Sequence, residues 1–295
     1  MFKNYCKKIK PKCAVLIGIN YSDCDEEMHL NGCINDIENI KDTLVGVFDY
    51  KDEEITMLRD DLSLKNDKPT GINILNALSK AVHSSDLYSE IWIHYSGHGV
   101  SINDRSGDEL DGKDEALVPC DFATGGIITD DLLFSILQHV KCPVFICMDC
   151  CHSGTGCDLP YSFYPSTENA KTFVRYTNKR KLENKNIYML SGCTDDQTSA
   201  DAFFKKTGKY GGAFTNALID VLKLNNYTLH IFDLYTQILS YLKRNHFQQR
   251  TTLTSSCSNP NIIISREQIK EKSLSSSSIL SRLKKNNSNI TFVDK

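Results

Sequence analysis

The sequence lacks the features that mark membrane proteins and nucleic-acid-binding proteins. No apolar run approaches the roughly 20 residues that a membrane-spanning helix needs, so we expect no membrane association. The 34 basic and 37 acidic residues give a net charge of −3, and without a basic excess we expect no nucleic-acid partner. Hydrophobic residues make up 40% of the 295 residues, which is typical of a globular chain. We see no internal repeat.

The amino end lacks a secretory signal. Residues 1–12 are basic, but no small-residue cleavage site follows them, and the apolar stretch 14–19 is too short for a signal core. The 12 cysteines therefore favour free thiols over a disulfide framework. We predict a cytoplasmic or nuclear location and interpret Cys13, Cys142 and Cys147 as core residues.

Apolar runs and helical patterns alternate along the chain. This order predicts an α/β fold with a mostly parallel central sheet and helices on both faces. We interpret 100–114 and 155–186 as loops, 261–264 as a last strand, and the Ser-rich stretch from about 265 as a loosely ordered tail. Strands are expected at 12–19, 55–58, 90–95, from 144 and at 187–190, and helices at 33–48, 70–82, 129–140, 212–224 and 229–245.

Two apolar runs end in residues that can perform covalent chemistry. One run leads into Asp149-Cys150-Cys151, and the other leads into Gly97-His98-Gly99. Because chemistry collects at the carboxyl ends of parallel strands, we expect these residues to meet at one edge of the sheet. A thiol beside an imidazole can act as a nucleophile, which predicts a Cys/His dyad.

Simpler interpretations exist for each of these residues. Considered singly, His98 fits a structural histidine in a glycine-rich turn, and a cysteine at a strand end fits an inert core thiol. His94 is expected in the core, and His152 is expected to point away from its neighbour Cys151. The spacing Cys147-x-x-Cys150 is compatible with zinc, but two side chains of one apolar strand do not converge, so we expect no zinc site.

At this point the sequence resembles the metacaspases, which are caspase-related cysteine proteases. The resemblance covers about residues 12–265 and implies a caspase-like fold. It departs from the family in lacking a long Pro- or Gln-rich N-terminal extension, in a short linker, and in Cys150, where Ser is more frequent. Four segments carry it in the family's order: Gly32-Cys33-Ile34-Asn35-Asp36, His94-Tyr95-Ser96-Gly97-His98-Gly99, Asp149-Cys150-Cys151-His152-Ser153-Gly154, and the stretch from Ser191 to Asp201.

The resemblance implies roles for individual residues near the dyad. Cys151, directly before His152-Ser153-Gly154, matches the family nucleophile, and His98 matches its base. The backbone N–H groups of Gly99 and Cys151 would form the oxyanion hole. The pocket for the residue before the scissile bond would be lined by Cys33, Asp36, Ser96 and Asp149.

The charge of that pocket predicts its specificity. Two carboxylates would favour arginine, whose planar fork can contact both, with lysine accepted less well and aspartate repelled. The alternative is that Asp36 only caps its helix and that Asp149 only accepts backbone hydrogen bonds.

A second set of acidic residues matches the calcium-binding positions of calcium-activated metacaspases. Carboxylate oxygens suit Ca²⁺, so the resemblance implies an activating calcium site and no organic cofactor. The alternative is helix capping by Asp130 and solvated loop charge elsewhere. The matching residues are Asp114, Asp130, Asp131 and Asp158.

The expected organisation is an N-terminal extension over 1–11, a protease domain over 12–265 and a flexible tail over 266–295. Within the domain we expect a large-subunit region over 12–155, a linker over 156–186 and a small-subunit region over 187–265. The basic run Lys179-Arg180-Lys181 is a candidate self-cleavage site, because exposed loops are preferred cutting sites.

The sequence thus predicts a monomeric cysteine endopeptidase that cuts protein or peptide substrates after Arg or Lys. A catalytically idle caspase-like scaffold or interaction protein is the alternative, although the intact dyad argues against it.

Overall fold

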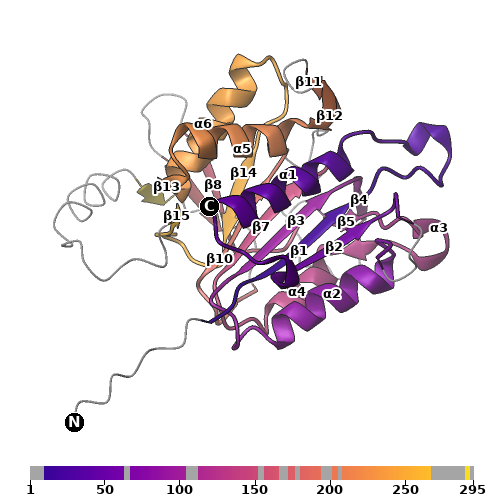
Figure 1. The fold of residues 1–295 in the computed structure, drawn as a ribbon. Coiled ribbons are helices and arrows are strands. Elements are labelled where there is room, and N and C mark those ends of the chain that lie inside the picture. The colour runs from indigo at the N-terminus through magenta and orange to yellow at the C-terminus, as the bar shows by residue number, and fades with distance from the viewer. Residues whose placement is uncertain are drawn as a thin grey trace, which may run out of the picture.

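The computed structural model describes residues 10–62, 67–103, 112–151, 156–165, 172–176, 180–193, 201–204, 208–266 and 290–292. A twisted sheet runs through the molecule (Figure 1). One face carries α2 (Gly71–His83) and α4 (Asp130–Leu137). The other face carries α1 (Cys33–Gly46), α5 (Ala213–Leu224) and α6 (Ile231–Arg244). The predicted layers, with helices on both faces, are confirmed.

The centre of the sheet is parallel, as predicted. In spatial order, the strands of this central part are β2 (Ile55–Arg59), β1 (Cys13–Gly18), β3 (Ile91–Ser96), β7 (Val144–Asp149) and β10 (Ile187–Ser191). Each adjacent pair among them is parallel. Continuous apolar runs form β1, β3, β7 and β10 because both of their faces are covered by helices, whereas the edge strand β2 is only partly buried.

Beyond β10 the sheet departs from the sequence prediction. It continues through the antiparallel strand β14 (Thr252–Ser255) to β8 (Tyr161–Pro165), β9 (Thr172–Tyr176) and β16 (Ile290–Phe292). The prediction of a plain loop over 155–186 was therefore wrong. These segments are short and carry many polar residues, so hydrogen bonding to neighbouring strands defines them rather than apolar periodicity.

Smaller sheets lie beside the main one. The segment predicted as an acidic loop contains β4 (Gly99–Asn103), which pairs with β5 (Lys113–Leu117) and, through it, with β6 (Ile128–Thr129). The expected last strand is β15 (Ile263–Ser265), which pairs with β13 (Thr228–His230) outside the main sheet. A hairpin of β11 (Asp201–Phe204) and β12 (Lys209–Gly212) precedes α5.

Two hydrophobic clusters hold the layers together. Alternate residues of β1 enter different clusters: Val15 packs with residues of α2 and α4, whereas Leu16 packs with residues of α1, α5 and α6. The helix starts follow local chemistry, because the Thr70 hydroxyl accepts the Asn73 N–H at 3.3 Å at the start of α2. Thr129 precedes α4 as predicted, but its side chain makes no capping hydrogen bond.

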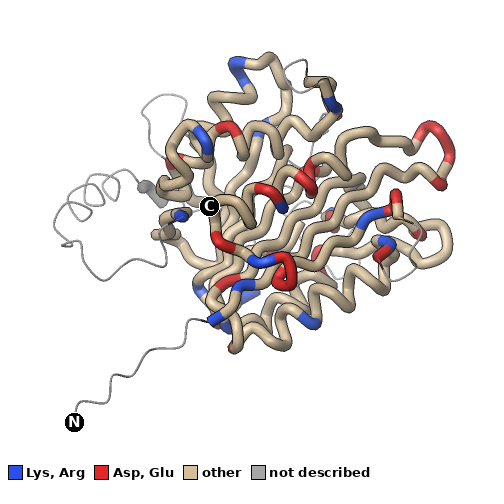
Figure 2. The backbone as a smooth tube through the Cα atoms, in the orientation of Figure 1, with Lys and Arg blue, Asp and Glu red and all other residues tan. Residues whose placement is uncertain are grey.

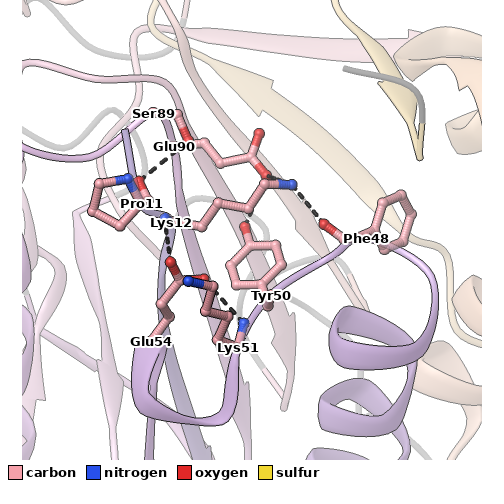
Figure 3. Close-up of polar contacts among 8 residues, drawn as sticks. All are labelled: Pro11, Lys12, Phe48, Tyr50, Lys51, Glu54, Ser89 and Glu90. Carbon is pink, nitrogen blue, oxygen red and sulfur yellow. Dashed lines mark hydrogen bonds and ion pairs between the residues drawn. The ribbon is translucent and has the colours of Figure 1, made fainter. Parts of the chain in front are cut away.

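The amino ends of β1 and β3 are joined by an ion pair. Lys12 Nζ lies 3.1 Å from Glu90 Oε1 and donates to the Phe48 carbonyl at 2.6 Å (Figure 3). The Tyr50 hydroxyl donates to the same Glu90 carboxylate at 3.0 Å. We call Lys12, Tyr50 and Glu90 the amino-edge cluster.

Charged positions of both signs are scattered over the backbone, as the small net charge suggests (Figure 2). Among the described residues, we find no helix with the length and apolar character needed to cross a membrane.

Candidate active site

His98 and Cys151 follow neighbouring parallel strands. In the register of β3 and β7, Ser96 lies opposite Asp149, and His98 and Cys151 each come two residues later. The Gly97 N–H donates to the Asp149 carbonyl at 3.4 Å, which keeps the chains together beyond the register. The structure therefore places both residues at the same carboxyl edge of the sheet, as the sequence predicts.

The two adjacent thiols differ in accessibility. Cys150 is 1% exposed and lies in the cluster formed with α2 and α4, whereas Cys151 is half-buried. A peptide substrate must reach the nucleophile, so the geometry favours Cys151 over Cys150. His152 lies outside the described residues.

The His98 imidazole is oriented by a backbone carbonyl. Its Nε2 lies 2.8 Å from the Met28 oxygen, and a carbonyl can only accept a hydrogen bond. A neutral His98 therefore carries its proton on Nε2, which leaves Nδ1 as the nitrogen able to accept a proton. That is the state a general base requires.

The backbone of Gly99 lies directly against Cys151. A Cβ atom at position 99 would overlap the Cys151 carbonyl oxygen and lie 3.3 Å from Cys150 Sγ. Only glycine allows this approach, and it brings the first residue of β4 to the nucleophile.

Asp36 belongs to a buried polar group next to the dyad. It lies in the first turn of α1 and is fully buried, and its Oδ2 accepts the Ser96 hydroxyl at 2.7 Å. The Gly212 N–H lies 3.0 Å from both Asp36 oxygens. Among the described residues, no lysine or arginine forms an ion pair with Asp36.

Asp149 lies on the other side of Gly212. Its Oδ2 accepts the Thr215 N–H at 2.8 Å and the Thr215 hydroxyl at 2.7 Å. A Cβ atom at Gly212 would overlap the Asp149 carboxylate and lie 2.8 Å from Asp36 Oδ2, so both carboxylates face this glycine. The start of α5 thus closes the group, and its N–H groups partly compensate the negative charge.

The proton affinities in this group are shifted by its own charges. Burial, followed by the neighbouring Asp149, raises the pKa of Asp36 well above the ordinary value. Burial and then Asp36 raise the pKa of the Cys33 thiol, so Cys33 is a neutral wall residue. Cys33, Asp36, Ser96 and Asp149 therefore form one connected group, which we call the acidic pocket.

The other residues considered for chemistry are structural. His94 is fully buried, burial lowers its pKa to about 3, and its Nε2 lies 3.3 Å from the Thr215 hydroxyl. Among the described residues, its Nδ1 has no hydrogen-bond partner, so the expected core histidine is only half satisfied. Cys147 and Cys150 lie in different hydrophobic clusters on opposite faces of β7, so they do not converge on a zinc ion.

Two of the predicted calcium residues form ion pairs with an arginine. The Arg180 guanidinium forms ion pairs with Asp131 and, at 3.1 Å, with Asp158, and it lies 5.1 Å from the centre of the Phe134 ring. The Asp131 N–H donates to Asp130 Oδ1 at 2.8 Å, and the Glu115 N–H donates to Asp130 Oδ2 at 2.8 Å. We call Asp114, Asp130, Asp131 and Asp158 the acidic cluster.

This cluster is crowded with negative charge. Burial, with Asp158 and Asp114 as further causes, raises the pKa of Asp130 to about 8. Its carboxylate oxygens are hard donors of the kind that Ca²⁺ prefers. Among the described residues, however, no group of His, Cys, Asp or Glu is arranged to hold a metal ion. In this structure Arg180 forms ion pairs with two members of the acidic cluster, Asp131 and Asp158.

The basic run is not uniformly exposed. Lys181 is exposed, whereas the Arg180 side chain is 26% exposed because the acidic cluster and Phe134 cover it. Lys179 lies outside the described residues.

Sequence reasoning missed several residues around the dyad. Tyr21 and Tyr95 contact the His98 segment, and Thr215 and Gly212 contact the acidic pocket. Tyr21 is an aromatic residue in the mainly polar stretch that follows the first strand, and that contrast was the available signal. Nothing local marks Thr215, because its partner lies 66 positions away.

The sequence is similar to one known protein family and to individual members of it. The family described as metacaspase, peptidase C14 domain, matches residues 12–160. A metacaspase-1 of Eremothecium gossypii is 37% identical over 206 residues, which is 69% of this chain and 42% of the relative. A metacaspase-1 of Pyricularia oryzae is 31% identical and covers 84% of this chain and 72% of the relative. The chain thus spans less than half of the first relative's length.

Solved structures show the same fold at lower identity. Caspase-1 of Spodoptera frugiperda superposes with a TM-score of 0.53 at 12% identity, covering 90% of this chain and 92% of its own. A protein of Geobacter sulfurreducens superposes with a TM-score of 0.54 at 22% identity, covering 86% and 94%. The expected caspase-like fold is confirmed.

Proposed function

The chain belongs to the metacaspase family, peptidase C14, and on this premise we propose that it is a cysteine endopeptidase that cuts after arginine and, less readily, after lysine. His98 Nδ1 takes the proton of the Cys151 thiol, and the sulfur attacks the scissile carbonyl carbon. The N–H groups of Gly99 and Cys151 stabilise the oxyanion. His98 then gives the proton to the leaving amine, and water hydrolyses the thioester.

The acidic pocket is the observation that supports the specificity. Asp36 and Asp149 lie beside the dyad, and burial, followed by the neighbouring Asp149 carboxylate, raises the pKa of Asp36. A substrate guanidinium supplies the missing positive charge and can donate to both carboxylates through its fork. It must take over part of the hydrogen bonding now made by the N–H groups of Gly212 and Thr215.

The test is a comparison of fluorogenic peptides that differ only in the residue before the scissile bond. Wild-type protein should cleave the arginyl peptide fastest, the lysyl peptide more slowly and the aspartyl peptide not measurably. Cys151→Ala should remove all cleavage while leaving the melting temperature unchanged, and Cys150→Ser should keep most activity. Preferential cleavage after Asp contradicts the specificity, and a folded but inactive wild type favours the scaffold alternative.

Calcium activation is the second part of the proposal. The donor chemistry of the acidic cluster fits Ca²⁺, although Asp131 and Asp158 are here paired with Arg180. Activity should therefore rise with millimolar Ca²⁺, and Asp130→Ala or Asp158→Ala should weaken the response. Equal activity in chelator and in calcium contradicts this part.

Self-processing is the third part. Lys179, Arg180 and Lys181 have the residue type that the acidic pocket selects. A calcium-dependent fragment should appear on a gel of the wild type and be absent from Cys151→Ala. An uncut chain with full activity would show that processing is not required.

A further inference from the structure

Two tyrosine hydroxyls bracket the main chain of His98. The Tyr21 hydroxyl accepts the His98 N–H at 2.9 Å, and the Tyr95 hydroxyl donates to the His98 carbonyl at 2.7 Å. Tyr21 is 1% exposed and Tyr95 is fully buried. Both ends of the residue that carries the general base are therefore held by side chains, one 77 positions away in the sequence and one three residues before it.

Each hydroxyl proton in this network can be assigned to an acceptor. Tyr21 uses its single hydroxyl proton on the Val118 carbonyl at 2.6 Å, which leaves its lone pairs for the His98 N–H. Tyr95 uses its proton on the His98 carbonyl and accepts the Val118 N–H at 3.3 Å. The two hydroxyl oxygens lie 3.3 Å apart, and burial raises the pKa of both phenols, so both remain neutral donors.

The Tyr21 ring also contacts the imidazole itself. The centres of the two rings lie 4.6 Å apart with an angle of 39° between their planes. Met28 holds the Nε2 edge of the imidazole at 2.8 Å, so the ring is fixed along one edge and over one face. A fixed imidazole directs Nδ1 without the entropy of a freely rotating side chain.

The backbone is strained where it supports these contacts. Tyr21 has φ of 56°, a left-handed conformation that is unusual for an aromatic residue. Such strain persists only where surrounding contacts impose it. At Gly97, a Cβ atom would lie 2.8 Å from the Tyr95 hydroxyl oxygen and 3.0 Å from that of Tyr21. The turn before His98 is thus shaped around the hydroxyl pair.

We propose that Tyr21 is a positioning residue for the general base: its hydroxyl fixes the His98 main chain, its ring fixes the imidazole plane, and Tyr95 holds the opposite end. This inference rests on the proposed Cys151/His98 chemistry, and it deepens that proposal by naming the residues through which the base is held. The competing explanation is that both tyrosines only fill the core.

Two conservative variants separate these explanations. Tyr21→Phe and Tyr95→Phe each keep the ring and remove one hydroxyl. The control is Tyr50→Phe, which removes a buried, hydrogen-bonded hydroxyl at the opposite edge of the sheet. All three should lose some stability, whereas only the first two should affect the dyad.

The primary measurement needs no peptide substrate. The rate at which iodoacetamide alkylates Cys151 is followed against pH by peptide mass spectrometry. A displaced His98 stabilises the thiolate less, so the midpoint should rise towards the value of an ordinary thiol, about 8.5. On the arginyl peptide, kcat should fall about tenfold with KM nearly unchanged, because a misplaced catalytic group slows chemistry more than binding.

The outcomes decide the inference independently of the proposed specificity. If Tyr21→Phe and Tyr95→Phe melt earlier but keep the wild-type alkylation profile and kcat, the tyrosines only fill the core and the inference is overturned. The same holds if Tyr50→Phe shifts the profile equally. If the alkylation profile shifts as expected but wild type does not cut arginyl peptides, the inference stands and the proposed specificity fails.

Discussion

Carboxylates have opposite surroundings at the two edges of the parallel sheet. At the amino-edge cluster, Glu90 lies 3.1 Å from the Lys12 ammonium and also accepts the Tyr50 hydroxyl (Figure 3). At the carboxyl edge, Asp36 has another carboxylate as neighbour and only neutral donors as described partners. The first arrangement joins two strands through an ion pair. The second concentrates negative charge and therefore favours binding of a cation. The contrast separates carboxylates placed for stability from carboxylates available for binding.

The largest expected effect comes from removing charge at the carboxyl edge. Asp36→Asn and Asp149→Asn should each lower kcat/KM for the arginyl peptide roughly a hundredfold, because a buried guanidinium loses one anionic partner. The melting temperature of Asp36→Asn should not fall, since the change relieves repulsion from Asp149. Kinetics and thermal melts on the same samples check this. Retained arginyl cleavage in a destabilised protein would make these carboxylates structural.

The opposite pattern is expected at the amino edge. Lys12→Met removes the cation from a largely buried pair and should lower the free energy of unfolding by about 1–3 kcal/mol. Its methylene contacts remain, so kcat/KM should stay at the wild-type value. Urea unfolding with parallel kinetics tests both statements. A loss of specificity on this substitution would mean that the two edges are coupled.

The acidic cluster is a third region, in which the cation beside the carboxylates is a side chain of the protein itself. In the inactive Cys151→Ala background, Arg180→Gln should strengthen terbium or calcium binding about tenfold, because the internal competitor is gone. Lys181→Gln is the matched control, since it removes a neighbouring charge that is exposed. Calorimetry or terbium luminescence gives the affinities. Equal affinity in the two variants would mean that Arg180 does not compete.

The last expected effect is a slope in stability with pH. The folded pKa of Asp130 is about 8, above the ordinary value of 3.8 that applies to the unfolded chain. Between these values the folded state binds a proton that the unfolded state has released. Stability should therefore fall as pH rises from about 4 to about 8. Asp130→Asn should flatten this part of the profile, measured by urea unfolding at several pH values, and an unchanged slope would assign it to other groups.

The sequence predicts the centre of the fold well because that centre is encoded locally. The strands ending at Ser96 and Asp149 are continuous apolar runs, and their carboxyl ends had to share an edge once the sheet was parallel. The dyad followed from that order, and the acidic pocket followed from the family motifs.

The remaining features depend on pairings that no local pattern shows. The strand Thr252–Ser255 is fully buried, yet only Leu253 is apolar, so periodicity does not reveal it. Arg180 meets Asp158 across 22 positions, and Tyr21 meets His98 across 77. Contacts of this kind are set by the assembled sheet and are visible only in the structure.

Arg180 has a consequence for the order of events if the chain cuts itself. While Arg180 neutralises Asp131 and Asp158, its guanidinium is engaged by these carboxylates and is not free to enter a substrate pocket. A divalent cation that replaces Arg180 would free the peptide bond after this residue for cleavage. The activating cation would thus displace the residue that becomes the substrate. Hydrolysis after Arg180 would then leave a new carboxylate on that residue, and its return to the acidic cluster would be opposed by repulsion. The cut would therefore be difficult to reverse, so that a brief rise in the cation concentration would leave a lasting change in the chain.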